Sequence, residues 1–151
     1  MKKLLSLVLS FLLLASLCPA LADTPPADQI AASGESYVEW YNKARANDDL
    51  ISHTKAGISA GTGFVLVRGV TETYSVADTI GVIYIIQRWE IDEWVNYYSV
   101  GYSKFDSDYI SDIRTIDVES GYYYRLNVIH KALKESQSDY NVSTTGSVYV
   151  N

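Results

Sequence analysis

A serine flanked by glycines is the clearest candidate nucleophile in the chain. The run Gly57-Ile58-Ser59-Ala60-Gly61 matches the nucleophile-elbow pattern, and acidic residues and His130 follow it in hydrolase order. That elbow needs a strand before the serine and a helix after it, whereas Ser59 is followed by Gly-Thr-Gly and a strand-like run. The sequence therefore favours a flexible glycine- and serine-rich entry to the first strand. Hydrolysis by Ser59 and His130 is the alternative.

Two histidines are the other candidates for acid–base work or metal binding. His53 lies in a polar stretch and is expected to be solvated. His130 ends a strand-like run on the inward phase, which indicates a histidine at the rim of a sheet rather than a catalytic one. Two histidines this far apart, without carboxylates at helical spacing, do not make a zinc site on their own.

Three aspartates crowd one predicted loop. Oxygen ligands at the short spacing of Asp106, Asp108 and Asp112 suit Ca²⁺. The loop lacks the glycine and the closing glutamate of an EF-hand, so a solvated acidic turn is the favoured interpretation. No cofactor is predicted.

Aromatic residues give the strongest indication of binding. Trp89 and Trp94 flank an acidic hairpin tip, and Tyr97 and Tyr123 fall on the opposite phase from the expected core residues of their strands. Exposed aromatic rings bind sugars or protein partners because they offer a large contact area at little entropic cost. The sequence predicts a ligand-binding surface from these four residues. The alternative is that the tryptophans close the end of the core and the tyrosines are ordinary strand residues.

The N-terminus predicts export. Lys2 and Lys3 precede an apolar run from residue 4 to 17, and Ala20-Leu21-Ala22 fits a signal peptidase site, so residues 1–22 are expected to be a signal peptide. The protein is then expected outside the cell or at its surface, with no transmembrane segment after cleavage.

The cysteine count depends on that cleavage. Cys18 raises the alternative of a lipid-anchored cysteine, although Leu17 stands where a lipobox needs a small residue. If Cys18 leaves with the signal, the mature chain has no cysteine, which excludes disulfides and thiolate chemistry.

Length and charge restrict the number of domains and the kinds of partner. Removing 22 of 151 residues leaves 129, which is enough for one domain. The cleavage lowers the number of Lys and Arg from 12 to 10, while Asp and Glu stay at 18, so the net charge becomes −8. Nucleic acids and anionic membranes require a basic face, so this balance argues against both.

The elements that must position these residues are mostly strands. Residues 23–57 read as a leader with a short helix over 36–47, because Ser36 and Glu39 have capping-box spacing and Glu39 and Lys43 are four apart. From residue 58 to 151 the pattern predicts short strands separated by turns, with the turns at 70–72, 90–93, 107–108, 119–121 and 134–136. The predicted strands run over 64–70, 80–89, 94–105, 113–118, 121–131 and 141–150.

This spacing indicates an all-β, immunoglobulin- or fibronectin-like sandwich over residues 58–151. Within it, Gly121 followed by Tyr124 and alternating aliphatic residues resembles the strand of a tyrosine corner, whose hydroxyl bonds back to the preceding corner.

A resemblance supports the same class. It rests on four runs: residues 121–130 (Gly-Tyr-Tyr-Tyr-Arg-Leu-Asn-Val-Ile-His), residues 86–89 with Trp94-Val95, residues 61–65 and residues 147–151. Together they resemble a family of small secreted β-rich proteins of Gram-positive bacteria, a domain of unknown function. The resemblance implies secretion and an all-β fold over roughly residues 58–151, about the size of one sandwich domain, and no activity.

The sequence thus predicts a secreted, non-enzymatic binding or interaction module with a glycan or protein partner. Besides the hydrolase, a self-associating surface protein is the other alternative, because the last strand, residues 147–151, could form an exposed edge.

Overall fold

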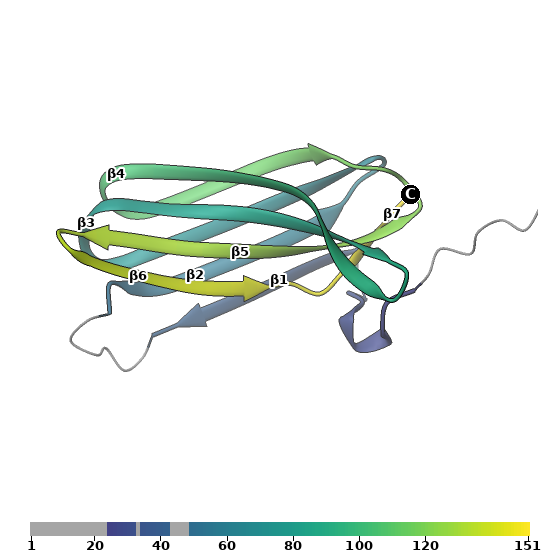
Figure 1. Cartoon of the computed structure of the whole chain (residues 1–151), viewed down its shortest axis with the longest axis horizontal. Helices are drawn as coiled ribbons and strands as arrows, with labels where there is room; N and C mark the ends of the chain where they lie inside the picture. The colour runs from purple at the N-terminus through teal and green to yellow at the C-terminus, as the bar shows by residue number, and fades with distance from the viewer. Residues whose placement is uncertain (1–23, 33, 43–48) are drawn as a thin grey trace, which may run out of the picture.

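The computed structural model describes residues 24–32, 34–42 and 49–151, so the predicted signal peptide lies outside the described residues. Nearly all of the described chain is in strands, which confirms the all-β prediction (Figure 1). The elements are η1 (Ala27–Gln29), β1 (Glu35–Tyr41), β2 (Ile51–Ala60), β3 (Phe64–Glu90), β4 (Glu93–Asp117), β5 (Tyr122–Lys134), β6 (Gln137–Thr144) and β7 (Val148–Val150). Within the described ranges, no helix has the length and apolar character that a membrane crossing requires.

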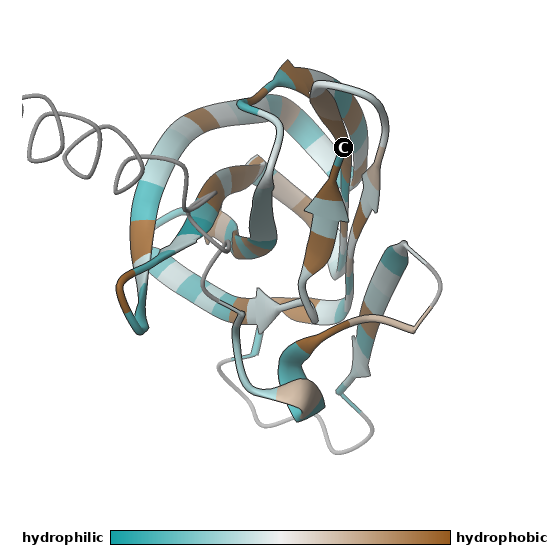
Figure 2. Ribbon diagram, turned by 90° about the vertical axis from the view of Figure 1, so that its right-hand side faces the viewer, coloured by the Kyte–Doolittle hydropathy of each residue, from teal (hydrophilic) through white to brown (hydrophobic). Residues whose placement is uncertain are grey.

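The strands form one antiparallel sheet that curls on itself (Figure 2). Its order is β1-β2-β3-β5-β6, with β4 also paired to β3 and β7 to β5. The first part of β3 pairs with β2, the second part pairs with β5, and β4 follows β3 through both parts. The two long strands therefore connect the two halves of the sheet.

A bulge in the middle of β3 allows this curl. The pairing of β3 with β4 jumps from Glu72–Tyr109 to Ala77–Ser107, so residues 73–76 stand opposite Asp108 alone. Extra residues in one strand bend it and increase its local twist. The predicted turns at 70–72 and 107–108 are therefore wrong. The polar residues there mark a bend within continuous strands rather than a break between them.

The core fills the space between the two halves. Even-numbered residues of β3 beyond the bend and of β5 face inward, and they meet inward residues of β2, the start of β3 and β7. Two hydrogen bonds cross this core: the Tyr84 hydroxyl donates to the Asp112 carbonyl at 2.9 Å, and Thr71 Oγ1 lies 2.9 Å from Nδ1 of His130. Both bonds connect strands from opposite halves and fix how the sheet closes.

The predicted helix over 36–47 is wrong for its described part, because Glu35–Tyr41 is strand β1. All seven residues pair with β2, from Glu35–Ser59 to Tyr41–His53. Aromatic and β-branched residues fit a pleated surface, and the open edge of β2 supplies hydrogen bonds that a short isolated helix lacks. The sheet thus includes β1 and β2, so the β-rich domain begins well before residue 58.

Other predictions of local structure are confirmed. The chain reverses at residues 90–93, where Ile91 and Asp92 both have positive φ, and at residues 119–121 and 134–136. The tyrosine corner also forms, since the Tyr124 hydroxyl donates to the carbonyl of Glu119 at 2.8 Å.

Candidate binding face

The two tryptophans predicted to bind ligand are covered by other groups. They pair edge to face across the β3–β4 hairpin with ring centroids 5.1 Å apart, and Trp89 is only 8% exposed. Trp94 is half-buried, its indole N–H donates to the side chain of Gln29 at 2.8 Å, and the Arg125 guanidinium lies 4.5 Å from its ring centroid. This arrangement matches the alternative in which the tryptophans close one end of the molecule.

The two predicted tyrosines lie on opposite sides of the sheet. Tyr97 packs against the core and meets Tyr124 edge to face at 5.5 Å, so the expectation that it points away from the core is wrong. A register shift between Ile86 and Gln87 changes the phase of β4 there. Tyr123 faces outward beside Tyr149, with centroids 4.9 Å apart. The four predicted residues do not share one surface.

Ser59 and His130 are not brought together. Ser59 is on the outer face of β2, where it pairs with Leu66, and a tight turn into β3 follows it rather than a helix. His130 bonds to Thr71, which pairs with Thr54. Ser59 lies five positions from Thr54, or ~17 Å along the strand, and on the opposite face.

His130 is fully buried, so its predicted place at the rim is wrong. Its Nδ1 is bonded to Thr71, while Nε2 is buried without a hydrogen-bond partner in the described chain. Burial, with a smaller contribution from His53, lowers the pKa of His130 to about 4. The imidazole is therefore neutral at physiological pH and is part of the packed core.

The three aspartates separate into two settings. Asp106, which has a positive φ, and Asp108 lie at the bend of β4, and the Asp108 carbonyl accepts from Thr73. The Asp112 carboxylate accepts from Arg114 at 2.9 Å. Among the described residues, no group of three or more potential ligands could hold a metal ion.

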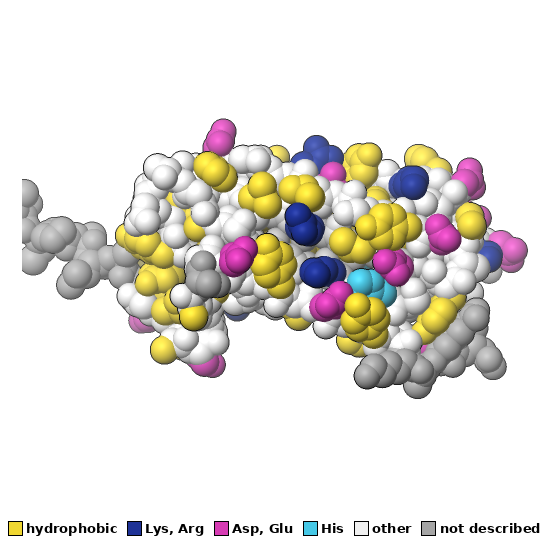
Figure 3. Space-filling model, turned by 180° about the vertical axis from the view of Figure 1, so that it is seen from behind, with side chains coloured by type: hydrophobic (Ala, Val, Ile, Leu, Met, Phe, Trp, Pro, Cys, Tyr) yellow, Lys and Arg dark blue, Asp and Glu magenta, His cyan; other side chains and the backbone are white. Residues whose placement is uncertain are grey.

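The structure reveals a different surface, on the outer side of β1, β2 and the first part of β3. We call it the tyrosine face and define it by Tyr37, Tyr41, His53, Lys55 and Arg68. Figure 3 shows hydrophobic, basic and acidic side chains gathered around a histidine on this side of the molecule.

Tyr37 forms the first flat ring on this face. It pairs with Gly57, and a Cβ at Gly57 would lie 2.5 Å from two carbons of the Tyr37 ring. The ring therefore rests directly on the glycine backbone. Its hydroxyl donates to Glu35 at 3.1 Å, and the side chain remains 50% exposed. The ring is thus supported by the sheet at Gly57, while half of the side chain stays exposed.

Tyr41, four residues further along β1, is the second supported ring of this face. Its ring stacks on His53 with centroids 4.2 Å apart and planes 7° apart, and it is 56% exposed. Its hydroxyl donates to Glu39 at 2.9 Å. This hydrogen bond is the largest cause that lowers the pKa of the Glu39 carboxyl, and the hydrogen bond from His53 is the second. The lowered pKa keeps Glu39 ionised.

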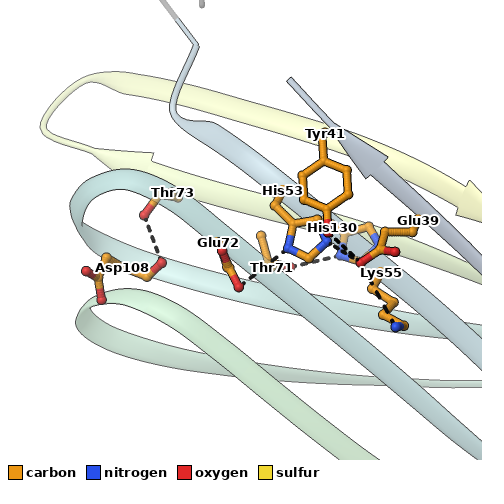
Figure 4. Close-up of polar contacts among 9 residues, drawn as sticks. All are labelled: Glu39, Tyr41, His53, Lys55, Thr71, Glu72, Thr73, Asp108 and His130. Carbon is orange, nitrogen blue, oxygen red and sulfur yellow. Dashed lines mark hydrogen bonds and ion pairs between the residues drawn. The ribbon is translucent and has the colours of Figure 1, made fainter. Parts of the chain in front are cut away.

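His53 connects three strands beneath the Tyr41 ring (Figure 4). Its Nε2 lies 2.9 Å from a Glu39 oxygen on β1, and its Nδ1 lies 3.4 Å from a Glu72 oxygen on β3. The expectation of a solvated histidine in a linker is therefore wrong. The contacts hold the imidazole flat and make it a support for Tyr41.

The basic groups of the face lie toward the Tyr37 end. Lys55 Nζ is 6.0 Å from the Tyr37 ring centroid and 4.0 Å from the nearest Glu39 oxygen. Arg68 pairs with Gly57 from the other side, and its Nε is buried without a hydrogen-bond partner among the described residues. No ion pair joins Arg68 to another described residue. At this end Lys55 has the Glu39 carboxylate nearby and Glu35 is bonded to Tyr37, so Arg68 is the basic group that no described carboxylate pairs.

The sequence does contain a signal for this face, which a helical reading of residues 36–47 hides. Glu35, Tyr37, Glu39 and Tyr41 form a repeated Glu-x-Tyr unit, in which each hydroxyl bonds to the glutamate two residues earlier. Residues two apart share a face only in a strand, so assigning a helix concealed the repeat.

No family model matches this chain, and comparison with curated proteins and with solved structures finds no match.

Proposed function

We propose that this protein is a secreted, non-enzymatic binding module that docks its partner on the tyrosine face. The observation that carries the proposal is a pair of half-exposed tyrosine rings supported by β2, with Tyr37 against Gly57 and Tyr41 stacked on His53. Rings held in place before binding lose little entropy when a ligand covers them. Both hydroxyls are fixed by glutamates, which adds to this preorganisation.

The remaining parts of the proposal rest on the sequence. The apolar N-terminus and the Ala-Leu-Ala site support export with cleavage before Asp23. The resemblance to small secreted β-rich proteins of Gram-positive bacteria supports the same location. The core between the halves of the sheet and the Tyr124 corner support an immunoglobulin-like sandwich as the scaffold. N-terminal sequencing of exported protein should therefore begin at Asp23, and a start at Met1 would contradict export by this signal.

The experiment is a binding assay of the purified protein on insoluble cell wall and on mucin. Gly57→Ala is the sharpest variant, because the added methyl group displaces the Tyr37 ring without removing any side chain. The Tyr37→Ala/Tyr41→Ala variant removes both rings. Phe105→Ala/Tyr140→Ala is the matched control, since it removes two aromatic side chains that are 72% and 73% exposed on β4 and β6.

We expect both variants of the tyrosine face to lose binding, with unchanged far-UV circular dichroism, and the control to bind like the wild type. Binding that persists in the Tyr37→Ala/Tyr41→Ala variant would refute the proposed face. Equal loss in the control would point to a general adhesive effect of exposed aromatics and would refute it as well.

Self-association is the second candidate, and the long edge of β4 favours it. Among the described residues, this 25-residue strand pairs only with β3, so its other edge is open. Unpaired strand edges are templates for pairing with another chain. The last strand is a weaker candidate, because Ser147 is bridged to Ile30. Light scattering that shows a monomer at all concentrations would reject self-association.

A further inference from the structure

We infer that the tyrosine face takes an oligosaccharide that carries isolated carboxylate groups. The inference rests on the proposed function and names the ligand class for that face. It comes from three features: two open rings, their separation along the strand, and the charge at one end.

The rings favour a saccharide over a peptide. A pyranose presents a flat face of C–H groups that packs on an aromatic ring. The rings of Tyr37 and Tyr41 are each half exposed on the outer side of the sheet, where a sugar ring can reach them. The two residues are four positions apart, which corresponds to ~13 Å along the strand. An extended chain of sugar rings can contact both platforms at once.

The charges place a carboxylate near Tyr37. Lys55 and Arg68 flank that ring, and Arg68 has no ion pair within the described chain. A guanidinium fits a carboxylate with two parallel hydrogen bonds, which makes Arg68 the natural partner for such a group. Glu35 also lies at the Tyr37 end, where its carboxylate accepts from the Tyr37 hydroxyl. The Tyr41 end presents the carboxylates of Glu39 and Glu72, which repel anions and accept hydrogen bonds from sugar hydroxyls.

The net charge of the chain restricts how acidic the ligand is. At −6 for the full chain, and −8 once residues 1–22 are removed, the protein repels a densely charged polyanion at long range. A saccharide with one carboxylate per disaccharide can still pair with the basic side chains of the face. The net charge of the protein repels such a saccharide much less than it repels a polyanion. We therefore expect such a glycan to bind better than a heavily sulfated one.

Calorimetric titration with matched ligands tests this inference. The first probe is an oligosaccharide of alternating N-acetylhexosamine and hexuronic acid, and the second is the same chain with its carboxyl groups reduced to alcohols. We expect the acidic form to bind roughly tenfold tighter, since a hydrogen bond to a charged group contributes about that much. Arg68→Gln should remove the preference, so that the acidic form binds no tighter than the reduced form.

The outcomes separate the inference from the proposed function. Equal binding of both forms by the wild type, lost in the Tyr37→Ala/Tyr41→Ala variant, would overturn the carboxylate preference and leave the binding face intact. A preference that survives in Arg68→Gln would overturn the role of Arg68. If neither form binds while cell wall or mucin is still retained through the tyrosine face, this ligand class is wrong. If nothing is retained, the proposed function fails as well.

Discussion

The buried His130 should make the stability of the protein depend on pH in a way that one substitution can isolate. The side chain is fully buried, and its pKa is lowered from 6.5 to about 4 by burial and, less strongly, by His53. Between these two values the unfolded chain binds a proton that the folded chain does not. The contribution of His130 to stability is therefore complete above about pH 6.5 and is lost as the pH falls toward about 4.

The size of the effect follows from the difference between the two pKa values. Each pKa unit corresponds to ~1.4 kcal/mol, so the free energy of unfolding should fall by ~3 kcal/mol from His130 alone across this range. That is a large fraction of the 5–15 kcal/mol that holds a typical domain together, or roughly a fifth to three fifths. A moderately stable protein would approach unfolding near pH 4 for this reason.

Urea unfolding at intervals between pH 7.5 and 4 measures this effect. His130→Gln keeps a group that can bond to Thr71 but does not titrate, and other acids contribute equally to both proteins. The wild type should lose ~3 kcal/mol relative to the variant over this range. His53→Gln is the control. It removes only the smaller cause of the lowered His130 pKa, so most of the pH dependence of stability should remain. A difference between wild type and His130→Gln that does not change with pH would refute the assignment of a buried neutral imidazole.

Three further predictions concern local structure. Ile91→Asn should raise the free energy of unfolding by ~1 kcal/mol, because a β-branched residue with φ of 45° is strained and asparagine tolerates that conformation; no gain in a urea melt would contradict this. Tyr124→Phe should lower it by ~1 kcal/mol through loss of the bond to Glu119, whereas an unchanged urea midpoint would mean that the corner contributes nothing. Gly69→Ala should destabilise by ~1–3 kcal/mol, because its Cβ would lie 2.9 Å from the ring and hydroxyl of Tyr84 in the core; a thermal melt like that of the wild type would show that the ring can move.

Local patterns predicted much of this fold. Alternating residues and turn chemistry located the strand around Tyr124 and the reversals at residues 90–93 and 134–136. Such features depend on neighbours a few residues away, which the sequence displays directly. The all-β class followed from the same information.

What the sequence did not predict depends on distant pairing. β1 is a strand because the edge of β2 is available to it, and nothing within residues 35–41 specifies that partner. Residues 70–72 look like a turn because Thr71 and Glu72 are polar, although the chain remains paired there and bends only at residues 73–76. Likewise, Trp94 seemed exposed beside an acidic tip, yet Gln29 and Arg125 reach it from remote parts of the chain.

Two glycines show why the candidate site in particular could not be found by sequence alone. Gly57 and Gly69 both lie in strands, and at each a Cβ would clash with a tyrosine ring, Tyr37 or Tyr84. The Tyr84 ring lies in the core, and its hydroxyl donates to the Asp112 carbonyl on the other side. Gly69 therefore makes room for a core side chain. The Tyr37 ring lies on the open side of the sheet and can rise into solvent, so Gly57→Ala should alter the surface and leave the fold intact. The residue types are the same at both places. Only the face of the strand separates a structural glycine from one that shapes a binding surface, and the register of β2 with β1 and β3 determines that face.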